Sequence, residues 1–376
     1  MTPGEWSPER RARAALSRLA EPEDQGVHTL IANHGPVETV RRIRALEGRL
    51  ARFAERVRRL DIERDAAIAA RVGARLVVPG DDEWPEGLDD LPIPPWCLWV
   101  RGAVRLDEAV GRSVAVVGAR AATSYGDAQA SEIAAGLGMA GWTVVSGAAY
   151  GIDGAAHRGA LAVDGLTVAV LACGVDRVYP AAHAQLLQRI AETGCILSEV
   201  APGSAPMGSR FLSRNRIIAA MTAGTVVVEA GLRSGSLQTM NRASQLNRPV
   251  GAVPGPVTSM TSAGCHNAIR NRDAMLVTNA AEVIELVGRI GEGSLAEPRE
   301  ESRPEDHLDP DEARVHQSLP RSGAIDLDAL LSATALAPMV VLAALTRLEE
   351  GGFAVKKDGG WRKIRRKGAV SGRAEG

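Results

Sequence analysis

The chain has 376 residues, of which 45% are hydrophobic, and its formal net charge is −1 at pH 7. This length and apolar fraction indicate a globular protein with two or three domains. The near-zero charge excludes a protein coated in positive charge, so a nucleic-acid site would have to be a local patch.

The four cysteines are far apart in the sequence and form no CxxC pair: Cys97, Cys173, Cys195 and Cys265. This spacing fits neither a zinc site nor a small disulfide scaffold, so we expect no metal and a reducing cytoplasm. The N-terminus lacks an apolar signal core, and no apolar run approaches the ~20 residues that span a bilayer. We therefore expect a soluble, cytoplasmic protein without membrane contact.

Residues 1–74 are expected to form a helical, SAM-like domain. Ser7 and Pro8 make an N-cap and a favoured first-turn proline, and apolar residues then recur at helical spacing. Turns at Gly26 and Gly35 would suit a helix-hairpin-helix contact with DNA, but we favour a packing or partner module. Residues 47–71 are expected to form one longer, charged helix.

A proline- and tryptophan-rich segment, residues 75–102, follows this helical domain. It predicts an extended segment packed on a neighbouring domain, because large apolar residues beside prolines generally pack.

From residue 113 onward, short apolar runs alternate with helical stretches. The runs cover residues 114–117, 143–145, 166–171, 195–200, 225–229 and 249–253. This alternation predicts an α/β domain over residues 75–288 with a doubly wound, mostly parallel sheet. Ligands of such sheets bind at the carboxyl ends of the strands, so the residues after each run are the candidates for a site.

Glycine turns with hydroxyl groups follow two of these runs. Ser146 and Gly147 lead toward Gly151, and a second turn is built from Ser234, Gly235 and Ser236. Glycine lets the main chain approach an anion, and a helix start presents free N–H groups. These turns predict a phosphate site, with no GxGxxG or GxxxxGK[ST] loop to indicate nicotinamide or ATP chemistry.

The stretch from residue 211 to 236 adds a ring and arginines to this edge. Phe211, Arg214 and Arg216 open a helix ahead of the 225–229 run. Arginine offers a planar fork to phosphate and an aromatic face stacks on a base, so single-stranded nucleic acid fits, with a nucleotide as the smaller alternative.

Two pairs of titratable residues are candidates for catalysis. Asp153 and His157 are four residues apart, but no nucleophile accompanies them, and we favour a helix-capping carboxylate and a packed imidazole. Glu199 and Glu229 end two strands and are interpreted as hydrogen-bond acceptors for nearby loops. We therefore expect no catalytic residue.

These motifs, taken in order, resemble the signature of the DNA-processing protein A (DprA/Smf) family. The resemblance rests on VAVVGAR at 114–120, SGAAYGIDGAAH at 146–157, GVDRVYP at 174–180, FLSRNRII at 211–218, SGSL at 234–237 and AVPG at 252–255. It implies an extended Rossmann fold, no reaction and no cofactor. It also implies a dimeric protein of natural transformation that binds single-stranded DNA, protects it and helps load RecA.

The resemblance also implies which residues bind DNA. Where the family commonly has a lysine before the phenylalanine and a proline after it, this chain has Gly208-Ser-Arg210 and Leu212, so Arg210 is expected to replace the cation. The expected DNA-binding residues are Gly118, Arg120, Ser146, Gly147, Gly151, Arg210, Phe211, Arg214, Asn215, Arg216, Ser234, Gly235 and Ser236.

The C-terminal part is expected to be separate. Residues 289–310 are predicted to be a flexible linker, residues 311–367 a winged-helix domain with a glycine hairpin, and residues 368–376 a tail. Basic residues gather in the wing and tail: Lys356, Lys357, Arg362, Lys363, Arg365, Arg366 and Lys367. Contact of this domain with duplex DNA or with a protein remains open.

Two other functions compete with single-strand binding. Related Rossmann lyases cleave the glycosidic bond of nucleoside phosphates, but they are expected to carry a glutamate after a Gly-Gly-x-Gly-Thr turn. Here the equivalent stretch, residues 234–239, reads SGSLQT. The third possibility is a transcription regulator that senses a nucleotide. We favour the non-enzymatic single-strand binder.

Overall fold

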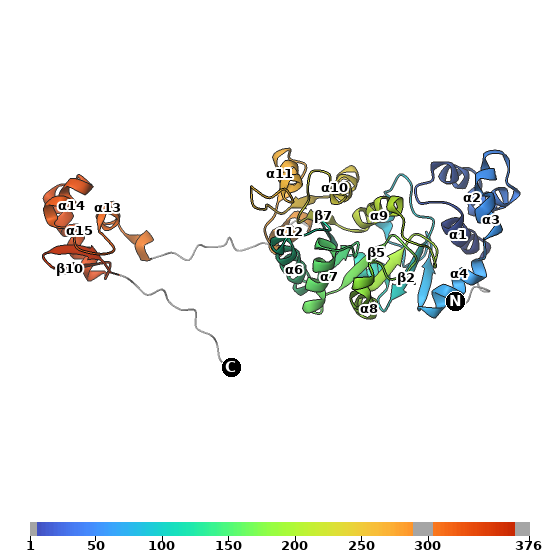
Figure 1. Ribbon diagram of the computed structural model, residues 1–376, viewed down its shortest axis with the longest axis horizontal. Coiled ribbons are helices and arrows are strands. Elements are labelled where there is room, and N and C mark those ends of the chain that lie inside the picture. Colours follow the sequence, from blue (N-terminus) through green and yellow to red (C-terminus); the bar gives the residue numbers. More distant parts are fainter. Residues whose placement is uncertain (1–5, 289–303, 365–376) are drawn as a thin grey trace. The chain divides into compact units, whose positions relative to one another are not determined.

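The computed structural model describes residues 6–288 and 304–364. The chain divides into two compact units, Met1–Leu295 and Ala296–Gly376, which are considered separately (Figure 1). The expected linker falls mostly outside the described residues, as do the expected tail and the basic residues Arg365, Arg366 and Lys367.

The N-terminal part of the first unit is helical, as expected. Its elements are α1 (Pro8–Leu19), α2 (Gln25–Ala45), the 3-10 helix η2 (Gly48–Phe53), α3 (Ala54–Arg58) and α4 (Ile62–Arg71). The Ser7 hydroxyl caps α1 by accepting from the Arg10 amide. The single helix expected over residues 47–71 is wrong, because Asp61 caps a new helix and accepts from the Arg64 amide.

These helices share a core with the proline-rich segment. Leu16, Val27 and Ile43 are buried together with Trp96, which comes from residues 75–102. Trp99 packs in a neighbouring cluster with Ala14. The packing role predicted for this segment is therefore confirmed, although it also contributes two strands that the sequence did not predict, because prolines and short length hid them.

Within the described residues, the first unit contains one nine-stranded sheet with the order β1-β2-β6-β5-β4-β3-β7-β8-β9. The strands are β1 (Ala74–Val77), β2 (Leu98–Gly102), β3 (Ser113–Val117), β4 (Thr143–Ser146), β5 (Thr167–Leu171), β6 (Cys195–Ser198), β7 (Gly224–Val227), β8 (Val250–Ala252) and β9 (Met275–Leu276). Strand β2 is antiparallel to both neighbours, and all other pairs are parallel. The predicted doubly wound, mostly parallel sheet is confirmed.

Helices cover both faces of this sheet (Figure 1). Val114 and Val116 of β3 pack toward α6 (Ser124–Met139), α7 (Ile152–Ala162) and α12 (Ala280–Val287), whereas Ala115 and Val117 pack toward α9 (Gly208–Met221) and α10 (Ser236–Gln245). Alternate side chains of a strand point to opposite faces, so burial on both sides requires continuous apolar runs. The remaining helices are α5 (Leu106–Val110), α8 (Ala184–Thr193), α11 (Ala263–Arg270) and the 3-10 turns η3 (Glu86–Leu88) and η4 (Ala181–His183).

The chain reverses direction across the sheet at β3. It passes from β3 through β4 and β5 to β6 on one side, then returns to place β7 on the other side of β3. Val117 and Val227 are direct partners at the ends of these two strands. A switch point of this kind opens a crevice beyond the carboxyl ends of the strands.

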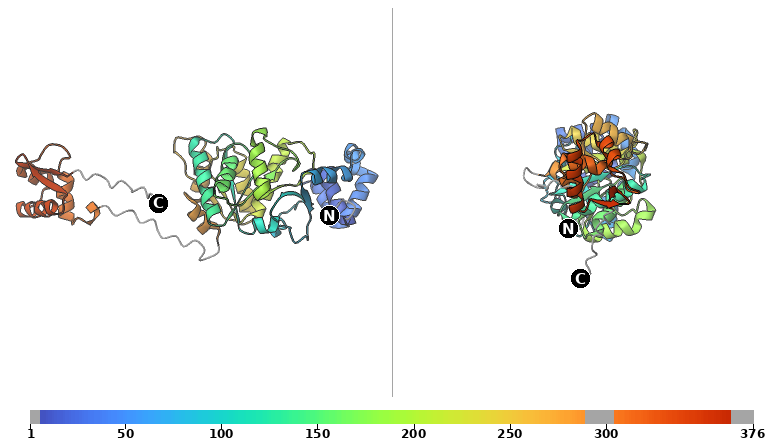
Figure 2. Two further views of the ribbon diagram at one scale, coloured as in Figure 1. Left: turned by 90° about the horizontal axis from the view of Figure 1, so that it is seen from below. Right: turned by 90° about the vertical axis from the view of Figure 1, so that its left-hand side faces the viewer.

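The second unit is small and mostly helical (Figure 2). The 3-10 turn η5 (Pro304–His307) precedes α13 (Pro310–Ser318), α14 (Leu327–Thr334) and α15 (Pro338–Glu350), which enclose a core that includes Val315, Leu330 and Leu345. Strands β10 (Ala354–Lys357) and β11 (Gly360–Lys363) pair as an antiparallel hairpin. Its turn residues Asp358 and Gly359 have φ of 54° and 80°, as a two-residue hairpin turn requires.

The expected hairpin with a glycine turn is therefore confirmed, while the winged-helix assignment stays a prediction. Among the described residues, no single helix is long and apolar enough to cross a membrane. Only α14 and α15 taken together pass that test, and they are bent by 107°.

Candidate nucleic-acid interface

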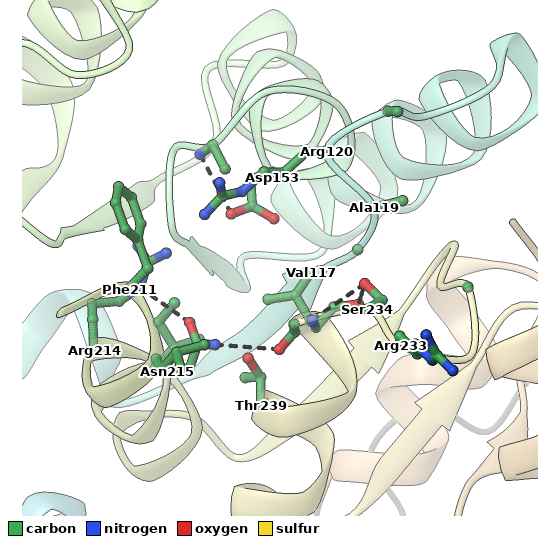
Figure 3. Close-up of a pocket in the computed structure, with 18 of the residues that line it drawn as sticks. Val117, Ala119, Arg120, Asp153, Phe211, Arg214, Asn215, Arg233, Ser234 and Thr239 are labelled. Carbon is green, nitrogen blue, oxygen red and sulfur yellow. Dashed lines mark hydrogen bonds between the residues drawn. The ribbon is translucent and has the colours of Figure 1, made fainter. Parts of the chain in front are cut away.

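A pocket of about 540 Å³ lies at the switch point, beyond the ends of β3 and β7 (Figure 3). Its walls come from the loops after β3, β4 and β7 and from the first turns of α9 and α10. Eight of the expected site residues line it: Gly118, Arg120, Phe211, Arg214, Asn215, Ser234, Gly235 and Ser236.

Arg120 and Phe211 form a cation–aromatic pair at this pocket. The guanidinium carbon of Arg120 is 4.8 Å from the centroid of the Phe211 ring, and the Arg120 side chain is exposed. Phe211 also neighbours Tyr179, whose ring centroid is 5.5 Å away. An exposed guanidinium held against a ring keeps its donors available for a phosphate.

Arg214 lies beneath the pocket and is almost fully buried, with 6% of its surface exposed. Its Nη1 donates to the carbonyl oxygen of Gly147 at 2.8 Å and also to that of Val170. Burial lowers the Arg214 pKa to about 10. The guanidinium also interacts electrostatically with the buried carboxylate of Asp153, whose own pKa burial raises. The buried Arg214 side chain thus connects α9 with the carboxyl ends of β4 and β5.

Asp153 holds the loop between β4 and α7. Its carboxylate accepts hydrogen bonds from the amides of Gly147 and Ala149, at 3.2 and 3.4 Å. His157 instead contacts the Thr167 hydroxyl at 2.7 Å. Asp153 and His157 therefore form no pair, and Asp153 binds the loop before the helix rather than capping the helix itself.

Asn215 connects α9 with the serine turn. Its side-chain amide donates to the carbonyl oxygen of Gly235 at 3.3 Å, and the hydroxyls of Ser234 and Ser236 are 2.7 Å apart. Helix α10 begins at this turn and has no side-chain cap. The first amides of the helix already donate within the turn, those of Leu237 and Gln238 to the carbonyl oxygens of Ser234 and Gly235. The turn therefore offers its two serine hydroxyls to an anion in the pocket.

Glu229 follows β7 and holds the loops that come after β3 and β8. It accepts from the amide and hydroxyl of Thr123 at 2.9 and 2.7 Å, and from the Thr261 hydroxyl at 3.1 Å. The acceptor role predicted for Glu229 is confirmed. Gly118 must be glycine here, because a Cβ would lie 2.5 Å from Ile152 and 2.9 Å from the Glu229 carbonyl.

Three expected residues of the β4 end do not line the pocket. The Ser146 hydroxyl is fully buried and donates to the Val116 carbonyl at 2.6 Å, so it cannot meet a phosphate. Gly147 lies under Arg214, where an added Cβ would be 2.3 Å from the guanidinium. Gly151 has φ of 71° and shapes the turn into α7.

Arg210 and Arg216 do not line the pocket either, which corrects the expectation that both face the ligand. Arg210 pairs with Glu21 of the loop between α1 and α2, at 2.8 Å. Arg216 is 1% exposed and pairs with Glu199 at 2.5 Å. Residues three and four positions after Phe211 share its helix face, whereas Arg216, five positions on, does not.

The sequence reasoning missed other lining residues, including Arg233, Thr239 and Thr261. Arg233 is exposed and directly precedes the predicted Ser234, so its place after a strand could have identified it. Thr261 comes from a loop 34 residues beyond the end of β7 and has no local sequence signal. Figure 3 shows Arg233 and Arg120 from different loops around one pocket.

His157 should make folding stability depend on pH. Burial lowers its pKa to about 3, from an ordinary value of 6.5. The unfolded chain therefore binds this proton more tightly, and the stabilisation present above pH 6.5 is lost as pH falls. We expect an additional loss of about 1.4 kcal/mol per pH unit between pH 6 and 4, measured by urea unfolding. A His157→Asn variant that keeps the same slope would contradict this assignment.

The fold and pocket define a class of protein. It is an α/β protein with a Rossmann-like sheet, and its switch-point pocket offers arginines, an aromatic ring and serine hydroxyls to a ligand with phosphates and bases.

Comparisons with known proteins agree with that class. The model of the DNA recombination-mediator protein A family matches residues 75–288. A DprA protein of Mycobacterium tuberculosis is 46% identical over 98% of both chains. The X-ray structure of DNA processing protein A from Streptococcus pneumoniae superposes with a TM-score of 0.63 at 32% identity, covering 77% of this chain and 100% of that one.

A second solved structure is similar to this chain. The Helicobacter pylori DNA processing protein A, described for its single-stranded DNA binding mode, matches with a TM-score of 0.51 at 27% identity, over 56% of this chain and 94% of that one. The protein belongs to the DNA recombination-mediator protein A family, DprA/Smf.

Proposed function

We propose that this protein binds single-stranded DNA in the switch-point pocket. The observation that carries the proposal is the Arg120–Phe211 pair beside the serine turn that starts α10. The guanidinium and the serine hydroxyls suit phosphates, and the ring suits a base, so the pocket matches a nucleic acid strand better than an inorganic anion. The single-stranded DNA binding described for the H. pylori relative supports the same ligand.

The proposed role is that of a mediator rather than an enzyme. Asp153 and His157 make separate structural contacts, and Thr239 stands where the lyases would need a glutamate. We infer that the protein protects incoming DNA and helps load RecA during natural transformation, as its family implies. Its place would be the cytoplasm, where its four reduced, buried cysteines are stable.

A homodimer is part of this proposal. Strand β9 forms one edge of the sheet, and its two residues Met275 and Leu276 are 64% and 50% exposed. An exposed apolar edge strand is a ready surface for association. Sedimentation equilibrium should give twice the chain mass, and a monomer at micromolar concentration would contradict the dimer.

The ligand class can be tested with oligonucleotides. Fluorescence anisotropy should show tighter binding to oligo-dT than to a duplex of equal length, with affinity falling as salt is added. The full chain with Lys356→Glu and Lys357→Glu tests whether the second unit contributes to duplex binding. Equal affinity for both forms, or release of free base from nucleoside monophosphates, would overturn the proposed function.

Phe211→Ala should weaken oligo-dT binding by about 1 to 3 kcal/mol, because a base would lose its stacking partner. The matched control is Phe353→Ala, since Phe353 is also half-buried but belongs to the second unit. Isothermal titration measures the affinities and circular dichroism the fold. Unchanged affinity of a folded Phe211→Ala protein would contradict stacking on this ring.

A further inference from the structure

Tyr179 extends the aromatic surface beyond the pocket. Its ring lies 5.5 Å from Phe211, at 52°, and 42% of the side chain is exposed. The whole chain has only three tyrosines and three phenylalanines, so two neighbouring, accessible rings are a concentrated feature. Phe211 thus contacts both Arg120, which lines the pocket, and Tyr179, which does not.

A second cavity, of about 500 Å³, lies on the other side of the first turn of α9. It is lined by residues of the N-terminal helices, by the loop 202–204, and by Met207 and Arg210. Arg210 directly precedes Phe211, so the two cavities share this helix turn. Arg177, two residues before Tyr179, donates to the carbonyl oxygen of Gly203 at 3.0 Å. The tyrosine loop therefore connects the pocket with the second cavity.

Five arginines line this second cavity: Arg18, Arg56, Arg59, Arg64 and Arg210. Three are held by acids, through the pairs of Arg18 with Asp65 and of both Arg56 and Arg210 with Glu21. The other two reach solvent.

The Arg59 side chain is 80% exposed, and it pairs with Glu55, whose side chain is half-exposed. Arg64 is also exposed, and it forms no ion pair with any residue in 6–288 or 304–364. An exposed ion pair such as Arg59–Glu55 contributes little free energy, so a phosphate can readily replace the carboxylate as the partner of the arginine.

We propose that a DNA strand bound in the switch-point pocket continues across Phe211 and Tyr179 into the second cavity, where Arg59 and Arg64 contact its phosphates. This extension rests on the proposed function. It assigns the N-terminal helices a direct part in binding, because they supply both arginines. A strand is favoured over an acidic peptide because the rings that join the two cavities match bases.

The test compares oligo-dT of two lengths on the full-length protein. Sites of this type cover about 4 to 16 nucleotides, so dT of about 5 nucleotides should fill the pocket alone and dT of about 15 should reach the second cavity. Arg64→Glu should weaken binding of the longer oligonucleotide by about tenfold and leave the shorter one within about twofold. Glutamate suits the first turn of α4 behind Asp61, so this variant should fold.

Two further variants separate the extension from general charge and folding effects. Arg71→Glu makes the same charge change on the same helix, outside the cavity, and should leave both affinities unchanged. Tyr179→Leu should lower affinity for the longer strand about fivefold or more, and Tyr179→Phe should restore it.

Equal losses for both lengths, or equal losses in Arg64→Glu and Arg71→Glu, would overturn the extension while leaving the pocket intact. If the parent protein binds neither oligonucleotide, the proposed function itself fails, and the extension with it.

Discussion

Arg214→Met is expected to lower the free energy of unfolding by about 3 to 5 kcal/mol at pH 7, because it leaves Asp153 buried without its cation. The methionine replaces the stem of Arg214 but removes the donors to the carbonyl oxygens of Gly147 and Val170. Urea unfolding followed by circular dichroism measures the loss. Oligo-dT binding should fall with it, because Arg214 fixes the floor of the pocket.

The control for this variant is Arg242→Met. Arg242 pairs with Glu23 at 3.0 Å, but its side chain is 39% exposed, so the loss should stay below about 1 kcal/mol. Adding Asp153→Asn to Arg214→Met should recover part of the stability, since the amide oxygen can still accept from Gly147. Equal stability of the two single variants would show that Arg214 is not the internal connection described above.

Arg120→Glu is expected to weaken oligo-dT binding about 10- to 100-fold at ~0.1 M salt while leaving stability nearly unchanged. A hydrogen bond to a charged group contributes about 1.5 to 3 kcal/mol, and the new carboxylate would also repel the phosphate. The slope of log affinity against log salt should become shallower by about 0.7, the value for one phosphate contact with a single strand.

Arg112→Glu is the matched control for Arg120. Arg112 also stacks on a ring, 4.9 Å from the Trp142 centroid, but it precedes β3 whereas Arg120 follows it. The two arginines therefore lie at opposite ends of one strand. If both charge reversals weakened binding equally, the loss would come from the change in overall charge. This result would contradict a contact between Arg120 and DNA in the pocket.

The sequence predicted the sheet and its ligand edge because both follow from local patterns. Apolar runs identify buried strands, and the residues after a run must lie near a carboxyl end, which is how the turn at Ser234 was predicted. The family resemblance supplied Gly118 and Arg120. The same rule could not tell that Ser146 turns its hydroxyl to the Val116 carbonyl, because that choice depends on which face of the sheet its strand position occupies.

Arg210 and Arg216 show a second limit. Their cations fit a DNA site by residue type, but the acids that hold them, Glu21 and Glu199, come from a distant loop and another strand. Helical phase alone could have removed Arg216, since it lies off the face shared by Phe211 and Asn215. The partner of Arg210 could not have been found without the tertiary structure, because it is 189 residues away.

Photo-cross-linking is the most direct test of the central claim that single-stranded DNA lies in the switch-point pocket. An oligo-dT carrying 5-iododeoxyuridine would be irradiated with the full-length protein, and the cross-linked residue identified by mass spectrometry. Binding in this pocket predicts cross-links at Phe211 that disappear in Arg120→Glu. Cross-links confined to residues 304–364, or unchanged by Arg120→Glu, would contradict it.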